Sequence, residues 1–444
     1  MSKYQNFGKL THISGGILLM YIAFNSASNL QSQIMDTDGF GQMGFYILAV
    51  LYLFMGFGSL LSTAIINKYG SRKCMIAGGI GNVQWILMTI LAAEQERKVN
   101  EDLIEDPNIY VTALLFLSTM INGLTVGILW TCANNYVARC SSIQNKGFAF
   151  SYFWTFYMTS QILGNMIAAY TLNTMSQTSF FLIMGGIALM GTLVFVCLQQ
   201  PTIEEPKDQQ EIENQKDEIE TMDTSRTEEE NKTEMNQSEF KSDIKLDYLF
   251  QQQQQRYQIC LSFGEIAGAI VQGKIVDKYG SKQTCLFNVG LILLATMFVL
   301  NYMYLQDYSL FAFVMTFMWG FQDSAISVHL NSVLGFEFDE SPGPFSLDSL
   351  LESTFVFAFQ LIQSLVVTWS AHFLYMSAVG VLGMGMCLTS YFFEYRHSFD
   401  KKTNQNRDQI EGIALTQLQR KDSANIKLKG SQTKKIKEEE FSSN

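Results

Sequence analysis

Long apolar segments constrain this chain more than any other feature of its sequence. The hydrocarbon core of a bilayer is about 30 Å thick, and a helix needs about 20 mostly apolar residues to cross it. Windows of that length with few charged residues occur eleven times. We therefore predict an all-α multi-pass membrane protein with about 11 transmembrane helices. The predicted spans are residues 12–33, 43–67, 73–93, 109–134, 148–171, 178–199, 257–277, 283–304, 309–334, 350–371 and 373–393.

Most of the net charge lies outside these windows. The 444 residues are 48% hydrophobic and 16% charged, with a formal net charge of −11. Residues 201–247 hold 16 Asp and Glu and 6 Lys and Arg, so the rest of the chain carries only −1 (−11 minus −10). The acidity therefore belongs to one linker, and we expect no nucleic-acid partner.

Composition also divides the chain into segments. Stretches too polar to bury a core are expected to be disordered. We predict an N-terminal six-helix half at 1–200, an acidic, Gln-rich disordered linker at 201–256, a C-terminal five-helix half at 257–395 and a cytoplasmic disordered tail at 396–444.

The sequence lacks the motifs of common enzymes. It contains no Walker-type phosphate loop, no H-E-x-x-H and no G-x-S-x-G. The four histidines lie far apart, and the seven cysteines do not have metal-type spacing. We predict no enzyme activity, no catalytic residue, no metal site and no cofactor.

One short run occurs twice. IINKYGSR at 65–72 and IVDKYGSK at 275–282 align at a constant offset of 210 residues (275 minus 65). A repeat of several helices in parallel orientation is typical of secondary transporters, whose two halves close around a site at the membrane midplane. The glycine in each copy allows two helices and a tight turn to approach closely.

Basic residues in the short loops predict which side of the membrane each loop faces. Lys and Arg precede the first span and follow the second and fourth spans. This pattern places both ends of the first six spans in the cytoplasm. The second copy of the turn and the C-terminal tail also carry lysines, so the last five spans must start outside and end inside. Since the linker should be cytoplasmic too, the topology is short by one crossing.

The missing crossing falls in the linker. At the same offset, the counterpart of 13–33 is 223–243, DTSRTEEENKTEMNQSEFKSD, which no bilayer accepts as a helix. We interpret this as the absence of the seventh of twelve helices, through a deletion or an error in the splicing of the gene model. The alternative is an eleven-span protein with a luminal linker, in which the sequons at Asn231 and Asn236 could carry glycans.

The second copy of the turn resembles a family signature. GKIVDKYGSK at 273–282 resembles the G-x-x-x-D-x-x-G-x-K signature of the major facilitator superfamily, which places a cytoplasmic gating latch in this loop. In the first copy, Thr63 replaces the leading Gly and Asn67 replaces the Asp. The resemblance implies a two-half helical bundle, with a purely structural turn as the alternative to gating. The gating-loop residues it implies are Lys68, Gly70, Arg72, Gly273, Asp277, Lys278, Gly280 and Lys282.

Four further motifs occur in order along the spans. They are AFNSASNLQSQI at 23–34, LWTCANNYVARC at 129–140, SQILGN at 160–165 and WGFQDSAISVHLNSVLGFEF at 319–338. Together they resemble the uncoordinated-93-like (unc-93-like) branch of the superfamily. Members of that branch are known as regulatory subunits of a potassium channel and as trafficking chaperones of receptors, and some relatives are presumed transporters. The resemblance implies a non-catalytic partner of an ion channel or receptor, with secondary transport of a small solute as the alternative.

Polar side chains inside two spans predict a central cavity. Those on 12–33 are spaced i, i+3, i+4 and i+7, so they share one helical face. Asp323 lies near the middle of 309–334, where a charge needs a partner, water or a proton. The resemblance implies that these two helices face the cavity; helix–helix hydrogen bonding is the alternative. The predicted cavity residues are Asn25, Ser28, Asn29, Ser32, Asp323, Ser327 and Asn331.

Glu265 is a further acid within a predicted span. It lies near Gly264 and Gly268 and could pair with a neighbouring helix or titrate. The spans imply a lipid bilayer as the immediate environment, in the plasma membrane or an endomembrane. The sequence identifies no solute.

Overall fold

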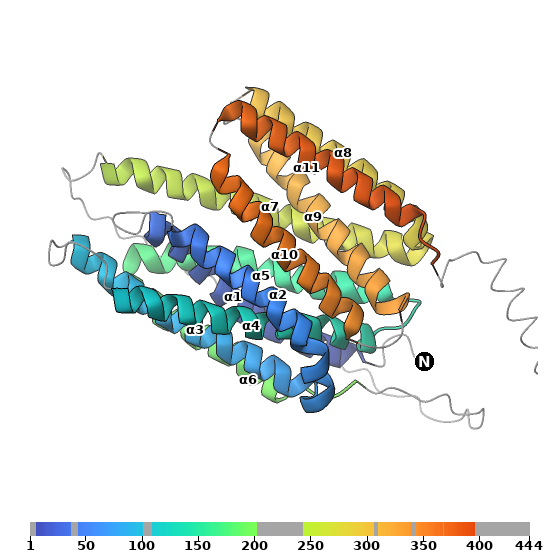
Figure 1. The fold of residues 1–444 in the computed structure, drawn as a ribbon, viewed down its shortest axis with the longest axis horizontal. Helices are drawn as coiled ribbons and strands as arrows, with labels where there is room; N and C mark the ends of the chain where they lie inside the picture. The colour runs from blue at the N-terminus through green and yellow to red at the C-terminus, as the bar shows by residue number, and fades with distance from the viewer. Residues whose placement is uncertain are drawn as a thin grey trace, which may run out of the picture. The chain divides into compact units, whose positions relative to one another are not determined.

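The computed structural model describes residues 6–36, 43–100, 109–201, 243–305, 310–338, 342–366 and 368–395. The described residues form helices joined by short turns (Figure 1). A separate unit, Tyr395–Asn444, contains the predicted cytoplasmic tail, which lies outside the described residues. The helices are α1 (Phe7–Asp36), α2 (Met43–Tyr69), α3 (Ser71–Asn100), α4 (Ile109–Cys140), α5 (Lys146–Thr174), α6 (Gln177–Val196), α7 (Asp243–Tyr279), α8 (Ser281–Leu305), α9 (Leu310–Phe336), α10 (Gly343–Leu365) and α11 (Trp369–Tyr391).

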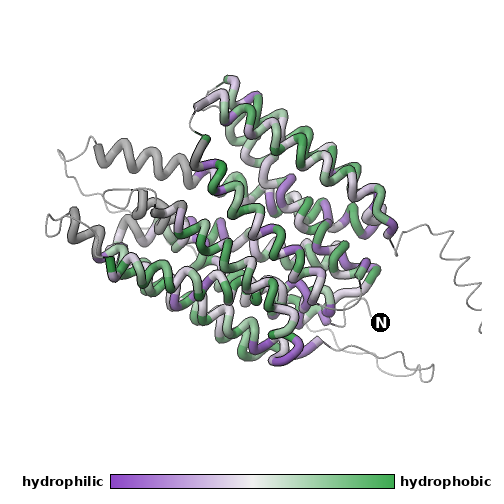
Figure 2. The backbone as a smooth tube through the Cα atoms, in the orientation of Figure 1, coloured by the Kyte–Doolittle hydropathy of each residue, from purple (hydrophilic) through white to green (hydrophobic). Residues whose placement is uncertain are grey.

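The all-α, eleven-helix prediction is confirmed over the described residues. Nine of these helices are long and apolar enough to cross a membrane. The other two, α5 and α9, contain more polar residues, including the buried Ser160 and Asn165 of α5 and the buried Ser324 and Asn331 of α9. Figure 2 shows hydrophobic residues along the helices and hydrophilic residues at the turn between α2 and α3. The chain is an integral membrane protein.

The repeated turn, at 65–72 and 275–282, has the same structure in both copies. Gly70 joins α2 to α3 with φ 82°, and Gly280 joins α7 to α8 with φ 78°. L-residues with side chains rarely adopt this left-handed conformation, which explains glycine at both positions. Each glycine N–H closes the preceding helix, on Ile66 O at 2.8 Å and on Val276 O at 3.0 Å. We call this end of the bundle the basic end; it carries Lys68, Arg72, Lys278 and Lys282.

The two halves also repeat their packing. In the first half α2 packs on α4, and in the second half α7 packs on α9. A Cβ at Gly58 would collide with the carbonyl oxygen of Leu124, and a Cβ at Gly268 would collide with that of Phe321. These glycines are separated by the same 210 residues (268 minus 58), so the offset applies to helix packing as well as to the turn. The halves meet where α5 packs on α7 and α2 packs on α10.

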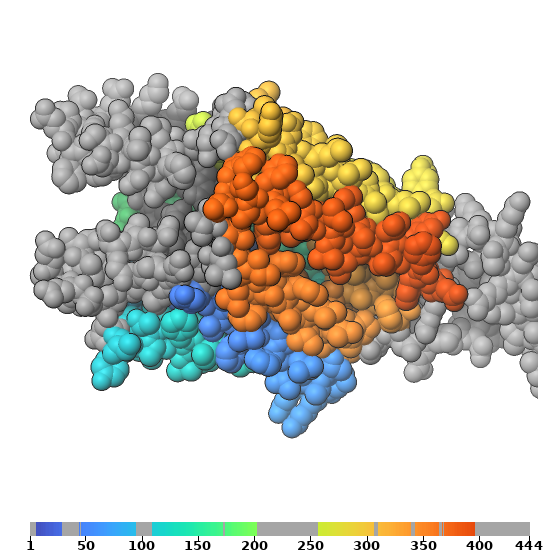
Figure 3. All heavy atoms as spheres, turned by 45° about the horizontal axis from the view of Figure 1, so that its top comes forward, coloured from blue at the N-terminus to red at the C-terminus, as the bar shows by residue number. Residues whose placement is uncertain are grey.

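The first helix has no counterpart among the described helices of the second half. In the first half α1 packs against both α5 and α6. No described helix packs against both members of the corresponding pair, α10 and α11; α11 packs along α8 and touches α10 through the rings of Phe359 and Tyr375. Figure 3 shows α10 and α11 adjacent on one face of the molecule.

The direction of the helices agrees with a crossing that is missing. The end of α6 lies at the basic end, where the Tyr136 hydroxyl donates to Gln199 O. The end of α7 lies there too, because Asp277 contacts the first residues of α5. Helices α6 and α7 therefore run in the same direction, so the described residues lack an antiparallel helix between them.

Two predicted boundaries are wrong. Helix α7 begins at Asp243 rather than at 257, so the Gln run that we predicted to be disordered is helical. Gln has a good helix propensity, and extending an existing helix costs far less than nucleating one. Helix α10 begins at Gly343 and ends at Leu365 instead of covering 350–371. The predicted window of few charged residues excluded Asp348, although it still contained Glu352.

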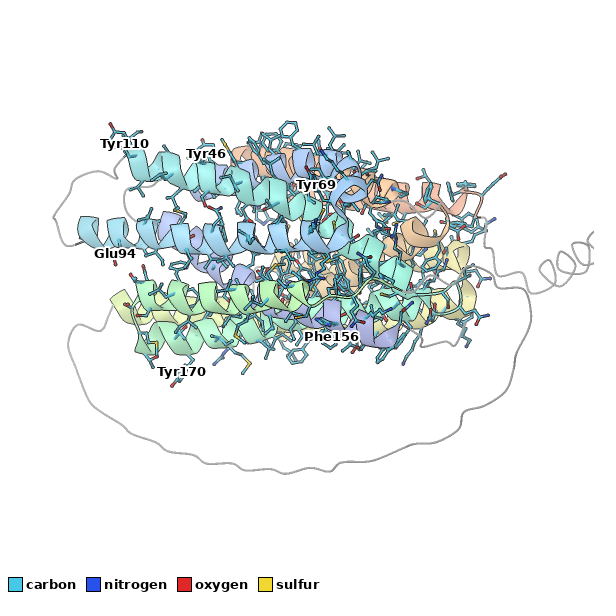
Figure 4. The ribbon with its side chains drawn as sticks, turned by 90° about the horizontal axis from the view of Figure 1, so that it is seen from below. Tyr46, Tyr69, Glu94, Tyr110, Phe156 and Tyr170 are labelled. Atoms are coloured by element: carbon cyan, nitrogen blue, oxygen red, sulfur yellow. The ribbon has the colours of Figure 1, made fainter. Side chains whose placement is uncertain are left out.

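Exposed tyrosines lie toward both ends of the bundle. Tyr110 and Tyr170 lie toward the end opposite the basic end, and Tyr69 lies beside Gly70 (Figure 4). Each of these side chains is more than half exposed. Tyrosine is enriched where a membrane meets water, because its ring is apolar and its hydroxyl is polar. These positions fit the two interfaces of a bilayer.

Candidate central cavity

A cavity of about 400 Å³ lies between the two halves. Helices α1, α2, α4 and α5 line it from the first half, and α7, α9 and α10 from the second. Five residues singled out from the sequence line it: Ser28, Glu265, Asp323, Ser327 and Asn331.

The remaining predicted cavity residues lie elsewhere. Asn25 does not line the cavity, because its side chain donates to Ser160 Oγ on α5 at 3.2 Å. Its position matches the alternative role of helix–helix hydrogen bonding. The side chains of Asn29 and Ser32 lie outside the described residues, although their backbone belongs to α1.

The second half supplies a wall of four carboxylates. Glu265 comes from α7, Asp323 from α9, and Asp348 and Glu352 from α10. The last two are four residues apart, which places them on one face of their helix. Asp323 lies close enough to interact electrostatically with both Glu265 and Glu352. None of the described residues that line the cavity is Lys, Arg or His.

The first half supplies a wall of aromatic rings. Tyr21 and Tyr157 meet edge to face with ring centroids 4.9 Å apart, and Trp130 lies 4.9 Å from Tyr157 in the same geometry. Trp154 extends the group, with its ring centroid 5.9 Å from that of Trp130. Offset and edge-to-face pairs of this kind hold rings in fixed orientations. The cavity is thus aromatic on one side and acidic on the other.

Two polar groups of the acidic side have no partner within the described residues. Oε2 of Glu265 makes no hydrogen bond, although only 5% of the residue is exposed. Oδ1 of Asn331, also 5% exposed, makes none either. A buried carboxylate or amide oxygen without a partner costs free energy, so a group that pairs with it on binding gains correspondingly.

Contacts between the halves close the basic end. The carboxylate of Asp277 accepts hydrogen bonds from Gly147 N at 2.8 Å and Phe148 N at 2.9 Å, at the first turn of α5. Carboxylates are favoured at a helix N-terminus by its free N–H groups and its dipole. Beside them, Lys146 Nζ lies 3.5 Å from Glu337 Oε1 in a fully buried ion pair. These contacts join α5 to both α7 and the end of α9.

A second set of contacts joins the halves nearer the cavity. Trp154 Nε1 donates to Ser324 Oγ at 3.1 Å, linking α5 to α9. On the opposite seam Ser59 Oγ donates to Ser349 Oγ at 2.9 Å, and Ser346 Oγ donates to Ser59 O. The cavity therefore has cross-half contacts on its basic-end side along both seams.

The predicted gating-loop residues divide into two groups. Around the second copy, Gly273 lies against Gly147 so closely that a Cβ on either would clash, which lets Asp277 reach α5. Around the first copy, Asn67 is exposed and Lys68 lies over the ring of Tyr69. Lys278 makes the same contact with Tyr279, and Lys282 lies over the ring of Tyr391. Arg72 is exposed. Within the described residues, only the second copy of the turn makes a latch contact, from Asp277 to the first turn of α5.

Sequence reasoning missed part of the cavity. Asp348 and Glu352 were not recognised, although acids at i and i+4 in an otherwise apolar helix are a detectable signal. The aromatic wall was missed because Trp and Tyr within membrane helices are common in lipid-facing and interfacial positions. Their convergence depends on the packing of three separate helices, α1, α4 and α5.

Comparison with known proteins places this architecture in a family. The sequence profile of the Major Facilitator Superfamily matches residues 13–243. The chain belongs to the Major Facilitator Superfamily. The match covers the first half and reaches the start of α7, and the equivalent packing of the second half completes the fold.

Relatives and solved structures support the same fold. The UNC93-like protein MFSD11 of Xenopus tropicalis is 20% identical over 195 residues, which are 42% of this chain and 40% of that protein. MFSD11 of Xenopus laevis matches with the same identity and coverage. The matched region therefore spans less than half the length of these relatives.

Among solved structures, the proton:xylose symporter XylE superposes with a TM-score of 0.57 at 11% identity, covering 86% of this chain and 96% of XylE. A bacterial homologue of the iron transporter ferroportin in its outward-facing state gives a TM-score of 0.60 at 8% identity, covering 86% and 98%. At these identities the similarity establishes the fold.

Proposed function

We propose that this protein is a secondary transporter that carries a small solute by alternating access. The observation that carries the proposal is the cavity of about 400 Å³ at the junction of two repeated halves, with ionisable groups inside it. Transporters built from two repeats bind their substrates at this junction and move one repeat against the other. The symporter and ferroportin-like structures with the same fold are transporters by their descriptions.

The contacts between the halves support a two-state mechanism. The basic end is held by hydrogen bonds from α5 to Asp277 and by the buried pair Lys146–Glu337. Such groups can separate without leaving apolar surface in water, unlike a packed hydrophobic core. If the basic end is cytoplasmic, as the loop charges predict, the structure is closed toward the cytoplasm. With α6 ending at that end, both termini of the first half are cytoplasmic in this proposal.

Transport is tested with purified full-length protein in liposomes. A panel of labelled solutes is offered under an imposed proton or sodium gradient, and accumulation is expected for at least one solute class. Asp323→Asn should abolish gradient-driven accumulation, whereas Glu94→Gln, outside the cavity, should retain it. Absence of accumulation across neutral, cationic and anionic solutes would reject the proposal.

A second function, docking of a channel or receptor, is favoured by the faces of α10 and α11. Only 6% of the residues in the membrane window of α11 are buried, against 44% in α6. On α10 the side chains of Leu347, Leu351 and Phe355 are 48–58% exposed at successive i, i+4 positions. In the first half α1 covers the corresponding pair, through Thr11 on Tyr152 and His12 on Val194 O.

Docking is tested by site-specific photocrosslinking. A photoreactive residue at Leu351 or Phe355 should crosslink a co-expressed potassium channel or receptor, and one at the exposed Leu117 of α4 should not. The similarity of part of the chain to an UNC93-like protein motivates these partners. Equal crosslinking from both faces, or unchanged surface density of the channel or receptor on co-expression, would reject this second function.

A further inference from the structure

We infer that the central cavity binds a small organic monocation, such as a protonated primary amine or a quaternary ammonium ion. The inference deepens the transport proposal, because it rests on the same cavity and specifies the class of solute. Its basis is the opposition of two walls: four carboxylates from the second half and a cluster of aromatic rings from the first.

The four carboxylates favour positive charge nearby. Glu265, Asp323, Asp348 and Glu352 line one cavity without a basic side chain among the lining residues. Ionisable groups at membrane depth are costly unless they are paired, hydrated or neutralised by a proton. Oε2 of Glu265 is buried and has no hydrogen-bond partner within the described residues, so one residue of this wall holds an unsatisfied acceptor. A cation bound there supplies the missing charge, and an anion is excluded by repulsion.

The aromatic rings specify the kind of cation. Ring faces attract ammonium groups through their quadrupoles, and several rings around one site form a cage for quaternary ammonium. Tyr21, Trp130, Trp154 and Tyr157 form one continuous contact cluster, with ring centroids 4.9–5.9 Å apart along the chain of contacts. All four line the cavity. An organic cation can contact rings with its apolar groups while its charge faces the acids.

A metal ion fits these walls poorly. Hard metal ions need about six oxygen ligands at roughly 2–2.6 Å. Within the described part of the chain no three His, Cys, Asp or Glu side chains are grouped closely enough to hold a metal. The aromatic side offers few oxygens. The volume of about 400 Å³ instead matches pockets that enclose small organic molecules.

Binding is measured on the full-length protein in nanodiscs, without any flux. Trp130 and Trp154 line the cavity and provide an intrinsic fluorescence signal. The probes are choline and its neutral isostere 3,3-dimethyl-1-butanol, which has the same shape without the charge. Choline should bind at least about tenfold more tightly than the isostere. This comparison needs no variant and therefore does not depend on a substitution being tolerated.

Variants locate the site. Glu265→Gln and Trp130→Leu should each weaken choline binding by about tenfold. The controls are Glu94→Gln on α3 and Trp369→Leu on α11, neither of which lines the cavity, and both should leave binding unchanged. Retained thermal unfolding midpoints show that each variant is folded.

Three results would overturn the inference. These are equal affinity for choline and its isostere, binding of Mn²⁺ but of no organic cation, and binding unaffected by both cavity variants. The outcome is separable from that of the transport proposal. Specific cation binding without flux would leave this assignment standing and reject transport. Accumulation of a neutral or anionic solute without cation binding would support transport and reject the cation assignment.

Discussion

At the scale of single residues, one carboxylate differs between the two copies of the repeated turn. Asp277 bonds two backbone N–H groups of α5, whereas the equivalent Asn67 is exposed. The offset of 210 residues and the departure at position 67 are both readable in the sequence. The two N–H donors are not, because they lie about 130 residues away on another helix. Position and chemistry of the latch residue were thus predictable, and its target was not.

Replacing Asp277 by Ala should destabilise the protein. The change removes both charge-assisted hydrogen bonds to the first turn of α5 and leaves those N–H groups unpaired, at a cost of about 2 kcal/mol. The measurement is the free energy of unfolding in a single detergent. The matched control is Asn67→Ala, which should change it by less than about 0.5 kcal/mol because the side chain is exposed. Equal losses from the two variants would contradict the described latch.

At the scale of helices, the existence of each helix was easier to predict than its first and last residues. Each of the eleven apolar windows corresponds to a helix, because length and absence of charge are strong signals for a span. The boundaries of α10 were wrong for the same reason that its function was missed. Asp348 made the first turns of the helix look unlike a membrane segment, and Glu352 lay just inside the predicted span, yet both line a cavity. A criterion tuned to lipid-facing helices is biased against helices that line a polar site.

The helix-packing difference between the halves gives a matched pair of substitutions. Gly191→Leu should destabilise the protein by about 1–3 kcal/mol, because a Cβ there would lie 2.7 Å from Met20 N on α1. Gly385→Leu on α11 should be tolerated, since nothing lies within 4 Å of where a Cβ of residue 385 would stand. Both are read as free energies of unfolding in the same detergent. Comparable losses of stability would show that α11 is covered by a part of the chain outside the described residues.

At the scale of the whole molecule, the repeat, the loop charges and the helix directions agree on one crossing that is lacking. Sequence predicted this from parity, and the parallel directions of α6 and α7 agree with it. Sequence could not show how the halves face each other. The aromatic wall and the acidic wall come from separate halves, so their opposition appears only when both are folded together.

The central claim, alternating access at the cavity between the halves, is tested most directly by distances between spin labels across each end. One pair replaces Tyr69 and Tyr279 at the basic end, and the other replaces Tyr110 and Tyr304 at the opposite end, all at least half exposed. The exposed Cys197 is changed to Ser beforehand to avoid unwanted labelling. On addition of a bound solute, we predict that the basic-end distances gain a longer population while those at the opposite end gain a shorter one. Unchanged distances at both ends with the solute bound would contradict the account.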